Sequence, residues 1–264
     1  MKVNDKTLVV TGGGSGMGRE LVRELLHRGA RVATLDINEE SLLETARLAS
    51  DHKEQISTHV IDITDKAAIE ALVDEVKQFH GSVDGIINNA GVIQPFINVN
   101  DLGYDKIEQV MNINFYGTLY MVKSFLPELL KRPEGHILNI SSMGGFLPVP
   151  GQSVYGASKA AVKLMTEGLH SELLDTNVGV TVAFPGAVKT NIMANSQVVR
   201  ESKAGDSGKE HKLTSASDAA KMMIDAIEAN QYRVMVGNDA KMMDRLYRLM
   251  PKKAAAIIAD KLKS

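Results

Sequence analysis

The sequence predicts an α/β domain whose parallel, doubly wound sheet carries helices on both faces. Two observations predict it: short Val/Ile/Leu-rich runs alternate with amphipathic stretches, and polar or glycine residues follow the ends of those runs. The chain has 264 residues, of which 44% are hydrophobic, and no linker divides it, so one domain is expected. We expect strands in the order 3-2-1-4-5-6-7, near 6–11, 31–36, 56–62, 83–88, 135–141, 178–184 and 232–236.

Helices are expected between these strands, near 16–28, 39–50, 65–80, 104–131, 152–176 and 216–229. Right-handed crossovers place the ligand site of such a sheet outside the carboxyl ends of its strands. Six notable residues stand at or just past a strand end: Gly12, Asp36, Asp62, Asn88, Ser142 and Pro185. We therefore expect them to surround one site.

The first strand leads into a glycine-rich loop, Thr11-Gly-Gly-Gly-Ser-Gly-Met-Gly18, and a helical pattern follows it. Gly12, Gly16 and Gly18 allow a sharp turn and a close approach of the backbone to a ligand. The helix start offers free N–H groups and the positive end of its dipole to a pyrophosphate. Strand, loop and helix in this order predict a dinucleotide site with the spacing G-x-x-x-G-x-G.

Asp36 ends the second strand, 18 residues after Gly18. A carboxylate there accepts hydrogen bonds from ribose hydroxyls and repels a 2′-phosphate. Neither Ser15 nor Ile37 is a cation that could hold that phosphate. The cofactor is therefore expected to be NAD(H) rather than NADP(H), although an aspartate at a strand end also suits a simple turn.

Tyr155 and Lys159 stand four residues apart in a helical pattern, which places both side chains on one helix face. A free tyrosine titrates near pH ~10, and a neighbouring ammonium favours the phenolate. The pair can therefore move protons. The same spacing also occurs on solvated helix faces, so the pair gains its meaning from the dinucleotide loop upstream.

Composition excludes several other functions. The formal charge is −2, from 30 basic and 32 acidic residues without a basic stripe, so a nucleic-acid partner is not expected. The absence of cysteine excludes disulfides and thiolate chemistry, and the seven histidines lack metal-ligand spacing, so no metal site is expected. The start lacks the apolar core of a signal peptide, and no apolar run approaches the ~18 residues of a membrane span, which favours a cytoplasmic protein.

The chain resembles the short-chain dehydrogenase/reductase family over nearly its whole length. The motifs that carry the resemblance are the glycine loop, Asn88-Asn-Ala-Gly91, Asn114-Phe-Tyr-Gly117, Ser142, Tyr155-x-x-x-Lys159 and Pro185-Gly186. The resemblance implies a Rossmann-type fold and an oxidoreductase that interconverts an alcohol and its ketone or aldehyde. It also implies a small-molecule substrate and a homodimer or homotetramer, because the helices at 104–131 and 152–176 resemble those that pair subunits in this family.

The resemblance implies four catalytic residues. Tyr155 is similar to the family's general acid/base, and Lys159 to the residue that lowers the tyrosine pKa and holds the nicotinamide ribose. Ser142, which precedes the tyrosine by 13 residues, resembles the serine that orients the substrate; Ser141 does not have this spacing. The Asn-x-x-Gly spacing selects Asn114 over Asn112 as the asparagine that anchors a proton-relay water.

The resemblance also assigns the cofactor contacts. Asp62 and the backbone of Ile63 resemble the adenine contacts, although a turn or N-cap role also suits Asp62. The segment from Pro185 to Thr190 resembles the part that passes over the nicotinamide, where the Val188 backbone and the Thr190 hydroxyl bind the carboxamide. The full expected set is Gly12, Ser15, Gly16, Met17, Gly18, Asp36, Ile37, Asp62, Ile63, Asn88, Ala90, Gly91, Tyr155, Lys159, Pro185, Gly186, Val188 and Thr190.

Apolar residues follow the motifs that border the substrate. Phe96, Phe146, Leu147 and Val149 are expected to line the substrate pocket, and no Arg or His in these segments could clamp an anion. They favour an apolar steroid, retinoid or fatty substrate, while ordinary packing beneath a lid explains them equally and leaves a small polar carbonyl compound open. The polar stretch 191–215 is expected to be that lid, or otherwise a surface insertion.

The end of the chain, 239–264, is an amphipathic tail with seven Lys/Arg and three Asp, and 1–238 forms the rest of the domain. The tail is expected to pack on a partner subunit or beside the substrate pocket, with an anionic membrane surface as the less favoured alternative. Two other functions were weighed. A cofactor-sensing protein without chemistry usually lacks the tyrosine or the lysine, and an esterase needs G-x-S-x-G, which Ile140 breaks ahead of Ser142.

Overall fold

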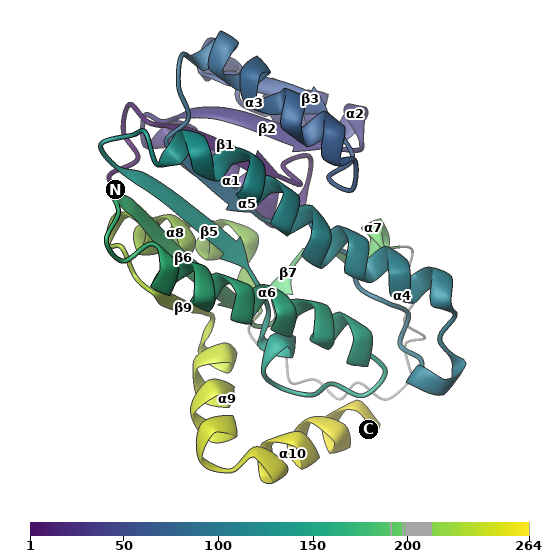
Figure 1. Cartoon of the computed structure of the whole chain (residues 1–264). Helices are drawn as coiled ribbons and strands as arrows, with labels where there is room; N and C mark the ends of the chain where they lie inside the picture. The colour runs from purple at the N-terminus through teal and green to yellow at the C-terminus, as the bar shows by residue number, and fades with distance from the viewer. Residues whose placement is uncertain (191, 197, 199–212, 264) are drawn as a thin grey trace.

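The structure is a computed structural model that describes residues 1–190, 192–196, 198 and 213–263. Its centre is a sheet of seven parallel strands in the order β3-β2-β1-β4-β5-β6-β9 (Figure 1). The predicted order is confirmed, and the last strand is β9 because two short strands form a separate ribbon before it. The strands are β1 Thr7–Thr11, β2 Arg31–Asp36, β3 Ile56–Val60, β4 Gly85–Asn88, β5 Gly135–Ile140, β6 Val178–Pro185, β7 Val188–Lys189, β8 Thr214–Ser215 and β9 Arg233–Val236.

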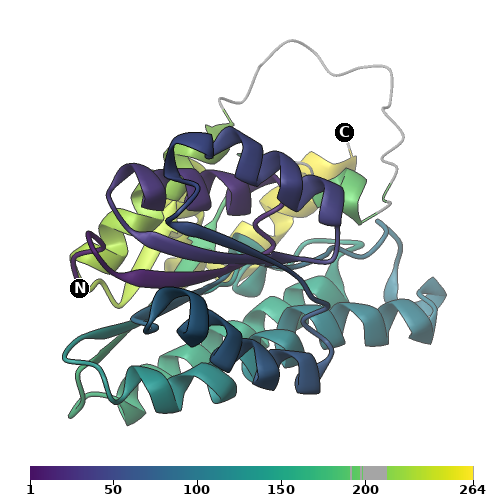
Figure 2. The same cartoon turned by 90° about the horizontal axis from the view of Figure 1, so that it is seen from above.

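Helices cover both faces of the sheet, as the view from above shows (Figure 2). α1 (Gly16–His27), α2 (Glu39–Leu48) and α8 (Ala216–Glu228) lie on one face. The other face carries α3 (Lys66–His80), the continuous stretch from α4 (Tyr104–Met111) to α5 (Thr118–Leu129), and α6 (Ser153–Glu172). This arrangement is the expected doubly wound α/β fold.

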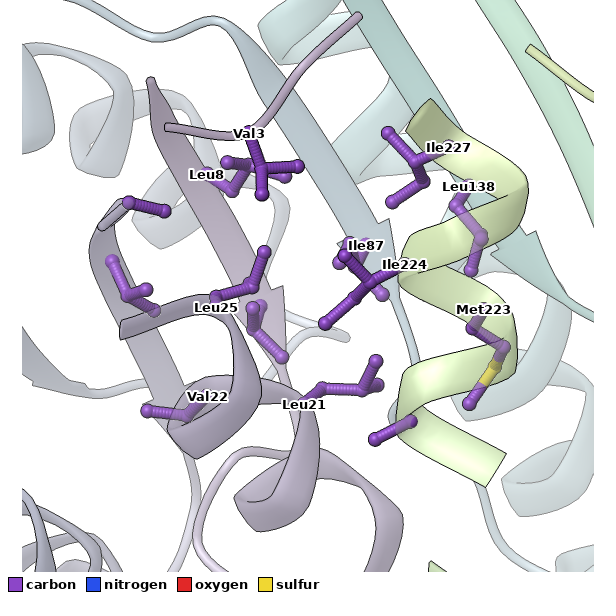
Figure 3. Close-up of a cluster of buried hydrophobic side chains, with 14 of the residues drawn as sticks. Val3, Leu8, Leu21, Val22, Leu25, Ile87, Leu138, Met223, Ile224 and Ile227 are labelled. Carbon is purple, nitrogen blue, oxygen red and sulfur yellow. The ribbon is translucent and has the colours of Figure 1, made fainter. Parts of the chain in front are cut away.

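The apolar stripe of α1 packs against α8 and the sheet beneath them (Figure 3). Leu21 and Leu25, four residues apart, face Ile224 and Ile227 of α8 across a cluster without solvent exposure. A second cluster, around Phe125, joins α3, α5 and α6 to the opposite face. Because α1 is held in this way, its first turn is fixed beside the glycine loop.

The predicted helix at 104–131 is interrupted. A π-helical turn, η3 (Asn112–Gly117), separates α4 from α5. The side chain of Asn114 turns inward and exchanges two hydrogen bonds with the backbone of Val92, each 2.9 Å long. Gly117 lies against Ile63, where a Cβ would come within 2.7 Å of the isoleucine side chain. The extra residue of the turn allows both contacts, and π-turns of this kind often occur at functional sites.

The tail forms two helices, α9 (Asn238–Leu249) and α10 (Pro251–Lys263), which project beside the sheet (Figure 1). Their inner side chains, Met243 and Ala254, are buried against Leu147. Of the expected positions for the tail, the structure supports the one beside the segment that follows Ser142. Among the described helices, none has the length and apolar character needed to cross a bilayer.

Candidate active site

A cavity of about 390 Å³ opens at the carboxyl ends of the central strands. It is bordered by the glycine loop, the end of β2, the loop after β3, the segment after β4 and the short helix α7 (Ile192–Asn195). Eleven of the expected cofactor residues line it: Gly12, Ser15, Gly16, Met17, Asp36, Ile37, Asp62, Ile63, Ala90, Gly91 and Thr190. The cavity therefore lies where the doubly wound fold places its ligands.

The glycine loop is shaped by conformations that other residues rarely adopt. Gly12 has a φ of 68° and Gly16 a φ of 53°, both in the left-handed region. Gly18 does not line the cavity. It packs against the Gly12 carbonyl, and a Cβ on Gly18 would also stand 2.6 Å from Nδ2 of Asn89. This contact brings the start of α1 against the loop, and the first two residues of the helix, Gly16 and Met17, line the cavity, which suits a pyrophosphate.

Asp36 is held in place at the end of β2. One carboxylate oxygen accepts the Gly14 N–H at 3.0 Å and the other accepts the Asn38 N–H at 3.1 Å. The side chain borders the cavity together with Ile37, Asn38 and Ser41. No lysine or arginine is among the described residues that line this cavity, so this wall offers acceptors and hydroxyls rather than cations.

Asp62 lines the cavity and also shapes its own loop. Its Oδ1 accepts from the Thr64 N–H and from the Thr64 hydroxyl, both at 2.8 Å. The turn role that the sequence left open is therefore present. β3 ends at Val60, two residues earlier than expected, because this turn begins there. The N-cap of α3 is Asp65.

Asn88 does not reach the cavity. Its Nδ2 donates to Oδ1 of Asn139 on β5 at 2.7 Å, in the interior of the sheet. Asn89 lines the cavity instead, and its side chain holds the Thr11 and Gly12 carbonyls at 3.0 and 3.3 Å. Asn88 thus has a structural role, because it still belongs to the strand and only the next residue lines this cavity; its contact with the cofactor stays a prediction.

The segment after β6 is bound to the start of α9. Gly186 donates its N–H to Val236, and Ala187 donates to the Asp239 carboxylate at 2.6 Å. Val188 lies in the β7–β8 ribbon, and Pro185 pairs with Val236 on β9. Of this segment only Thr190 lines the cavity, so Pro185, Gly186 and Val188 fix its course without bordering it.

Ser142 and Tyr155 meet where this fold brings the end of β5 to α6. Both side chains lie against Gly144, where a Cβ would stand 3.4 Å from the Tyr155 ring and 3.5 Å from Oγ of Ser142, and this Oγ accepts the Gly144 N–H at 3.0 Å. Burial raises the pKa of Tyr155, and the hydrogen bond from Ser142 acts in the opposite direction because it favours the phenolate. Ser141 donates instead to the Lys159 backbone carbonyl at 2.7 Å.

Lys159 is buried beside this pair. Its Nζ donates to the Ile140 carbonyl at 3.0 Å, and burial lowers its pKa to about 8. Burial raises the pKa of Tyr155 and Ser142 opposes that rise, while the lowering of this pKa by Lys159 stays a prediction. Lys159 lies behind Gly91, which lines the cavity: a Cβ on Gly91 would stand 3.1 Å from Nζ of Lys159.

Asn114 is fully buried and joins three parts of the site. Besides its bonds to Val92, it donates to the Ser158 hydroxyl at 2.9 Å, and its own carbonyl accepts from Thr118. Its Oδ1 lies beside Gly91, at 3.1 Å from the position of a Cβ there. Asn112 makes no comparable contact within the described residues, so the structure brings Asn114 and Lys159 together at the same wall.

The expected substrate residues divide into two groups. The Phe146 ring meets Phe184 and Tyr247 at 5.6 and 6.3 Å between centroids. Leu147 has no exposed surface and packs with Met243 and Ala254, so it supports this wall from behind and is corrected from a lining to a packing residue. Val149 is half-buried, and Phe96, 40% exposed, lies against Gly151.

The predicted lid, 191–215, falls largely outside the described residues. Its described part includes α7, which bridges the cavity: Asn195 donates to the Ser15 hydroxyl at 2.9 Å, and the Ser196 hydroxyl accepts the Ile93 N–H at 3.0 Å. Asn195, Ser196 and Asn89 are not among the site residues expected from the sequence. Only Asn89 carried a signal, as the second asparagine of its motif; the other two contacts depend on tertiary structure.

The fold and its motifs agree with known proteins. Residues 6–200 match the family profile described as short chain dehydrogenase. The provisionally named oxidoreductase SadH of Mycobacterium tuberculosis is 35% identical over 260 residues, covering 96% of this chain and 94% of that protein.

Two solved structures from Burkholderia are similar as well. A short chain dehydrogenase/reductase from B. phymatum, in complex with NAD, has a TM-score of 0.85 and 25% identity over 94% of both chains. A short chain dehydrogenase from B. cenocepacia, in complex with NADP, has a TM-score of 0.81 and 26% identity, covering 98% of this chain and 99% of that one. The chain therefore belongs to the short-chain dehydrogenase/reductase family of oxidoreductases, whose fold binds nicotinamide cofactors.

Proposed function

We propose that the protein interconverts an alcohol and its ketone or aldehyde with NAD(H), and that Tyr155 is the general acid/base. The observation that carries the proposal is the meeting of Ser142 and Tyr155 at Gly144, together with the buried Lys159 behind Gly91, which lines the cavity proposed for the dinucleotide. The fit is supported by the glycine loop, where a Cβ on Gly12 would stand 3.0 Å from Asn89 and Ala90.

The four residues have separate tasks in this reaction. The nicotinamide cofactor supplies or accepts the hydride. Tyr155 gives a proton to the carbonyl oxygen in reduction and takes it from the alcohol in oxidation, while the Ser142 hydroxyl donates to the same oxygen. Lys159 holds the nicotinamide ribose, and Asn114 keeps Gly91 and Lys159 in place. Burial raises the Tyr155 pKa and so favours the protonated phenol, the form that gives its proton in reduction.

The preference for NAD(H) rests on Asp36. Both of its oxygens are fixed by backbone N–H groups at the edge of the cavity, and its negative charge disfavours a 2′-phosphate. Asp36→Asn removes the charge and keeps an oxygen for one of these two bonds. We expect the ratio of kcat/KM with NADP to that with NAD to rise about tenfold, equivalent to about 1.4 kcal/mol. An unchanged ratio would remove Asp36 from cofactor selection.

An apolar substrate is supported by the wall of Phe146, Phe184 and Tyr247 that follows Ser142. We propose a steroid, retinoid or fatty alcohol and its carbonyl partner. A homodimer or homotetramer is also proposed, because Tyr104 on α4 and Leu164 on α6 are 82% and 68% exposed on the helices that pair subunits in relatives. Sedimentation of the purified chain tests the second point.

The central experiment is an assay of NADH absorbance with steroid, retinoid, fatty and short secondary alcohols, with NAD and NADP in parallel. Tyr155→Phe should lose about a thousandfold in kcat, because the proton transfer is lost, and should keep its NADH affinity within severalfold. Retained activity in this variant would exclude Tyr155 as the acid/base. Tight NADH binding without turnover of any substrate by the wild type would favour the cofactor-sensing alternative.

A further inference from the structure

Gln94 is fully buried at the start of α6, 61 residues before Tyr155 in the sequence. Its Oε1 accepts the N–H of Val154 at 2.9 Å and the N–H of Tyr155 at 3.0 Å. Its Nε2 donates to the Gly151 carbonyl at 2.8 Å and, more weakly, to the Ile97 carbonyl at 3.4 Å. The oxygen of this side-chain amide therefore binds the first turn of α6, and its nitrogen binds the turn that leads into the helix and, more weakly, its own segment.

α6 depends on this side chain for its N-terminal cap. A helix leaves its first N–H groups without internal partners, and the N-cap side chain normally accepts one of them. The N-cap of α6 is Gln152, whose side chain makes no such bond in the described structure. It donates to the Gln94 backbone carbonyl at 2.7 Å instead. The cap is thus supplied from another segment, and one of the two capped N–H groups is that of Tyr155.

Gln94 also ends a segment that borders the cofactor cavity. In this segment, 90–94, Ala90 donates to Thr11 at the end of β1, and Val92 is bound on both sides by Asn114. Gly91 and Val92 line the cavity, and Gly91 lies against Lys159. A displacement of Gln94 would therefore change the position of Tyr155 relative to the cavity wall.

We propose that Gln94 is a positioning residue of the active site, which holds the first turn of α6 so that Tyr155 stays within hydrogen-bond reach of Ser142 and in register with the cofactor cavity. The inference rests on the proposed role of Tyr155. It concerns a residue outside the catalytic set, because Gln94 acts through the helix backbone rather than on the substrate. Its amide is required as such, since the position needs an acceptor and a donor together.

The test is a double-mutant cycle of Gln94→Met and Ser142→Ala. Methionine has a similar volume and cannot cap the helix, so we expect kcat of the single variant to fall at least about tenfold through misplacement of the phenol. If Gln94 acts by keeping Tyr155 at Ser142, the second substitution adds little to the first. Full additivity of the two effects would overturn the proposal.

A matched control separates positioning from general loss of stability. Asp65 caps α3 by accepting two N–H groups, those of Ala67 and Ala68, and α3 carries no expected catalytic residue. Asp65→Ala should lower Tm to a similar degree as Gln94→Met and leave kcat unchanged. A fall of kcat in Gln94→Met no larger than in Asp65→Ala would make Gln94 a purely structural residue.

A second readout does not require turnover. Carbon-13 labelling of tyrosine, with the Tyr155 resonance assigned by its loss in Tyr155→Phe, reports the Tyr155 pKa directly. Gln94→Met should raise that pKa, because the hydrogen bond from Ser142 is weakened; an unmoved titration would overturn the proposal. If the wild type turned over no substrate, the proposed function would fail while this titration would still decide the role of Gln94.

Should Gln94→Met fail to fold, Gln94→Glu replaces it, because the carboxylate keeps an oxygen for both helix N–H groups and loses only the bonds that Nε2 donates to Gly151 and Ile97. A carboxylate is also favourable at a helix N-terminus, so this variant should fold. In Gln94→Glu we expect the hydrogen bond between Ser142 and Tyr155 to persist. Adding Ser142→Ala to this variant should then raise the Tyr155 pKa further. Absence of that further rise would contradict the proposed link through the cap.

Discussion

The cofactor end of the site is formed mainly by backbone atoms, whereas the proposed substrate end is formed mainly by side chains. The cofactor end uses backbone atoms: Gly12 and Gly16 have positive φ, Gly18 packs against a carbonyl, and Asp36 is fixed by backbone N–H groups. The proposed substrate end uses apolar side chains that come from distant parts of the chain, with the Phe146 ring in contact with Phe184 and Tyr247. One end constrains the conformation of the chain, and the other constrains mainly volume and polarity.

This difference determines what each end tolerates. A backbone that approaches a ligand or another strand of chain leaves room for glycine alone, so a single methyl group is disruptive there. An apolar wall accepts many combinations of side chains of similar volume. The cofactor end should therefore lose function abruptly on substitution, while the substrate end should change its preference gradually.

Among the substitutions that compare the two ends, Gly18→Ala should have the largest effect. The added methyl group would collide with the Gly12 carbonyl and with Nδ2 of Asn89, neither of which can move without opening the loop. We expect the affinity for NADH to fall at least about a hundredfold, or about 2.7 kcal/mol, measured by calorimetric titration. The fold should persist, because α1 remains held by its contacts with α8.

Gly168→Ala is the matched control. Gly168 lies on α6, and a Cβ there would meet no atom within 4 Å. Alanine should leave NADH affinity unchanged and stabilise the helix by roughly 0.5–1 kcal/mol. Equal NADH affinities in Gly18→Ala and Gly168→Ala would refute the idea that the cofactor end depends on backbone approach.

The same division explains how far the sequence alone could go. The sheet order was predicted because each strand is a short apolar run, and the cavity was predicted because glycine and aspartate leave a visible pattern. The π-helical turn was not predicted, because the sequence Asn112–Gly117 has no pattern that distinguishes it from the helix on either side. What distinguishes the turn is the contact of Asn114 with Val92, which forms only in the folded chain. Nor was the raised pKa of Tyr155 predicted, because it depends on burial by distant segments.

Ser142 stands between the two ends and should show the next largest effect. Ser142→Ala removes the hydrogen bond that opposes the rise of the Tyr155 pKa. We expect kcat to fall about a hundredfold, in the range found when one donor to a reacting oxygen is removed. The rate of oxidation requires the phenolate and therefore increases with pH. Because the Tyr155 pKa is higher in Ser142→Ala, the curve of kcat/KM against pH for oxidation should move to higher pH.

Ser141→Ala controls for loss of a buried serine. Its hydroxyl donates to the Lys159 backbone carbonyl at 2.7 Å and does not touch Tyr155. Stability should fall by about 1 kcal/mol, while the pH–rate curve stays in place. If the pH–rate curve shifted equally in Ser141→Ala and Ser142→Ala, the shift would reflect a general disturbance at the end of β5 rather than the bond between Ser142 and Tyr155.

The smallest effect is expected at the substrate end, where Tyr247→Ala removes one ring from the wall that Phe146 forms with the tail. KM for an apolar alcohol should rise about tenfold, because an aromatic contact of this kind contributes about 1.5 kcal/mol, whereas NADH affinity should stay within twofold. Met242→Ala, on the same helix but 58% exposed, should change neither quantity. A purely apolar wall can affect the glycine loop only through a change in the fold as a whole. If Tyr247→Ala weakened NADH binding as much as substrate binding, the two ends would therefore not be separable.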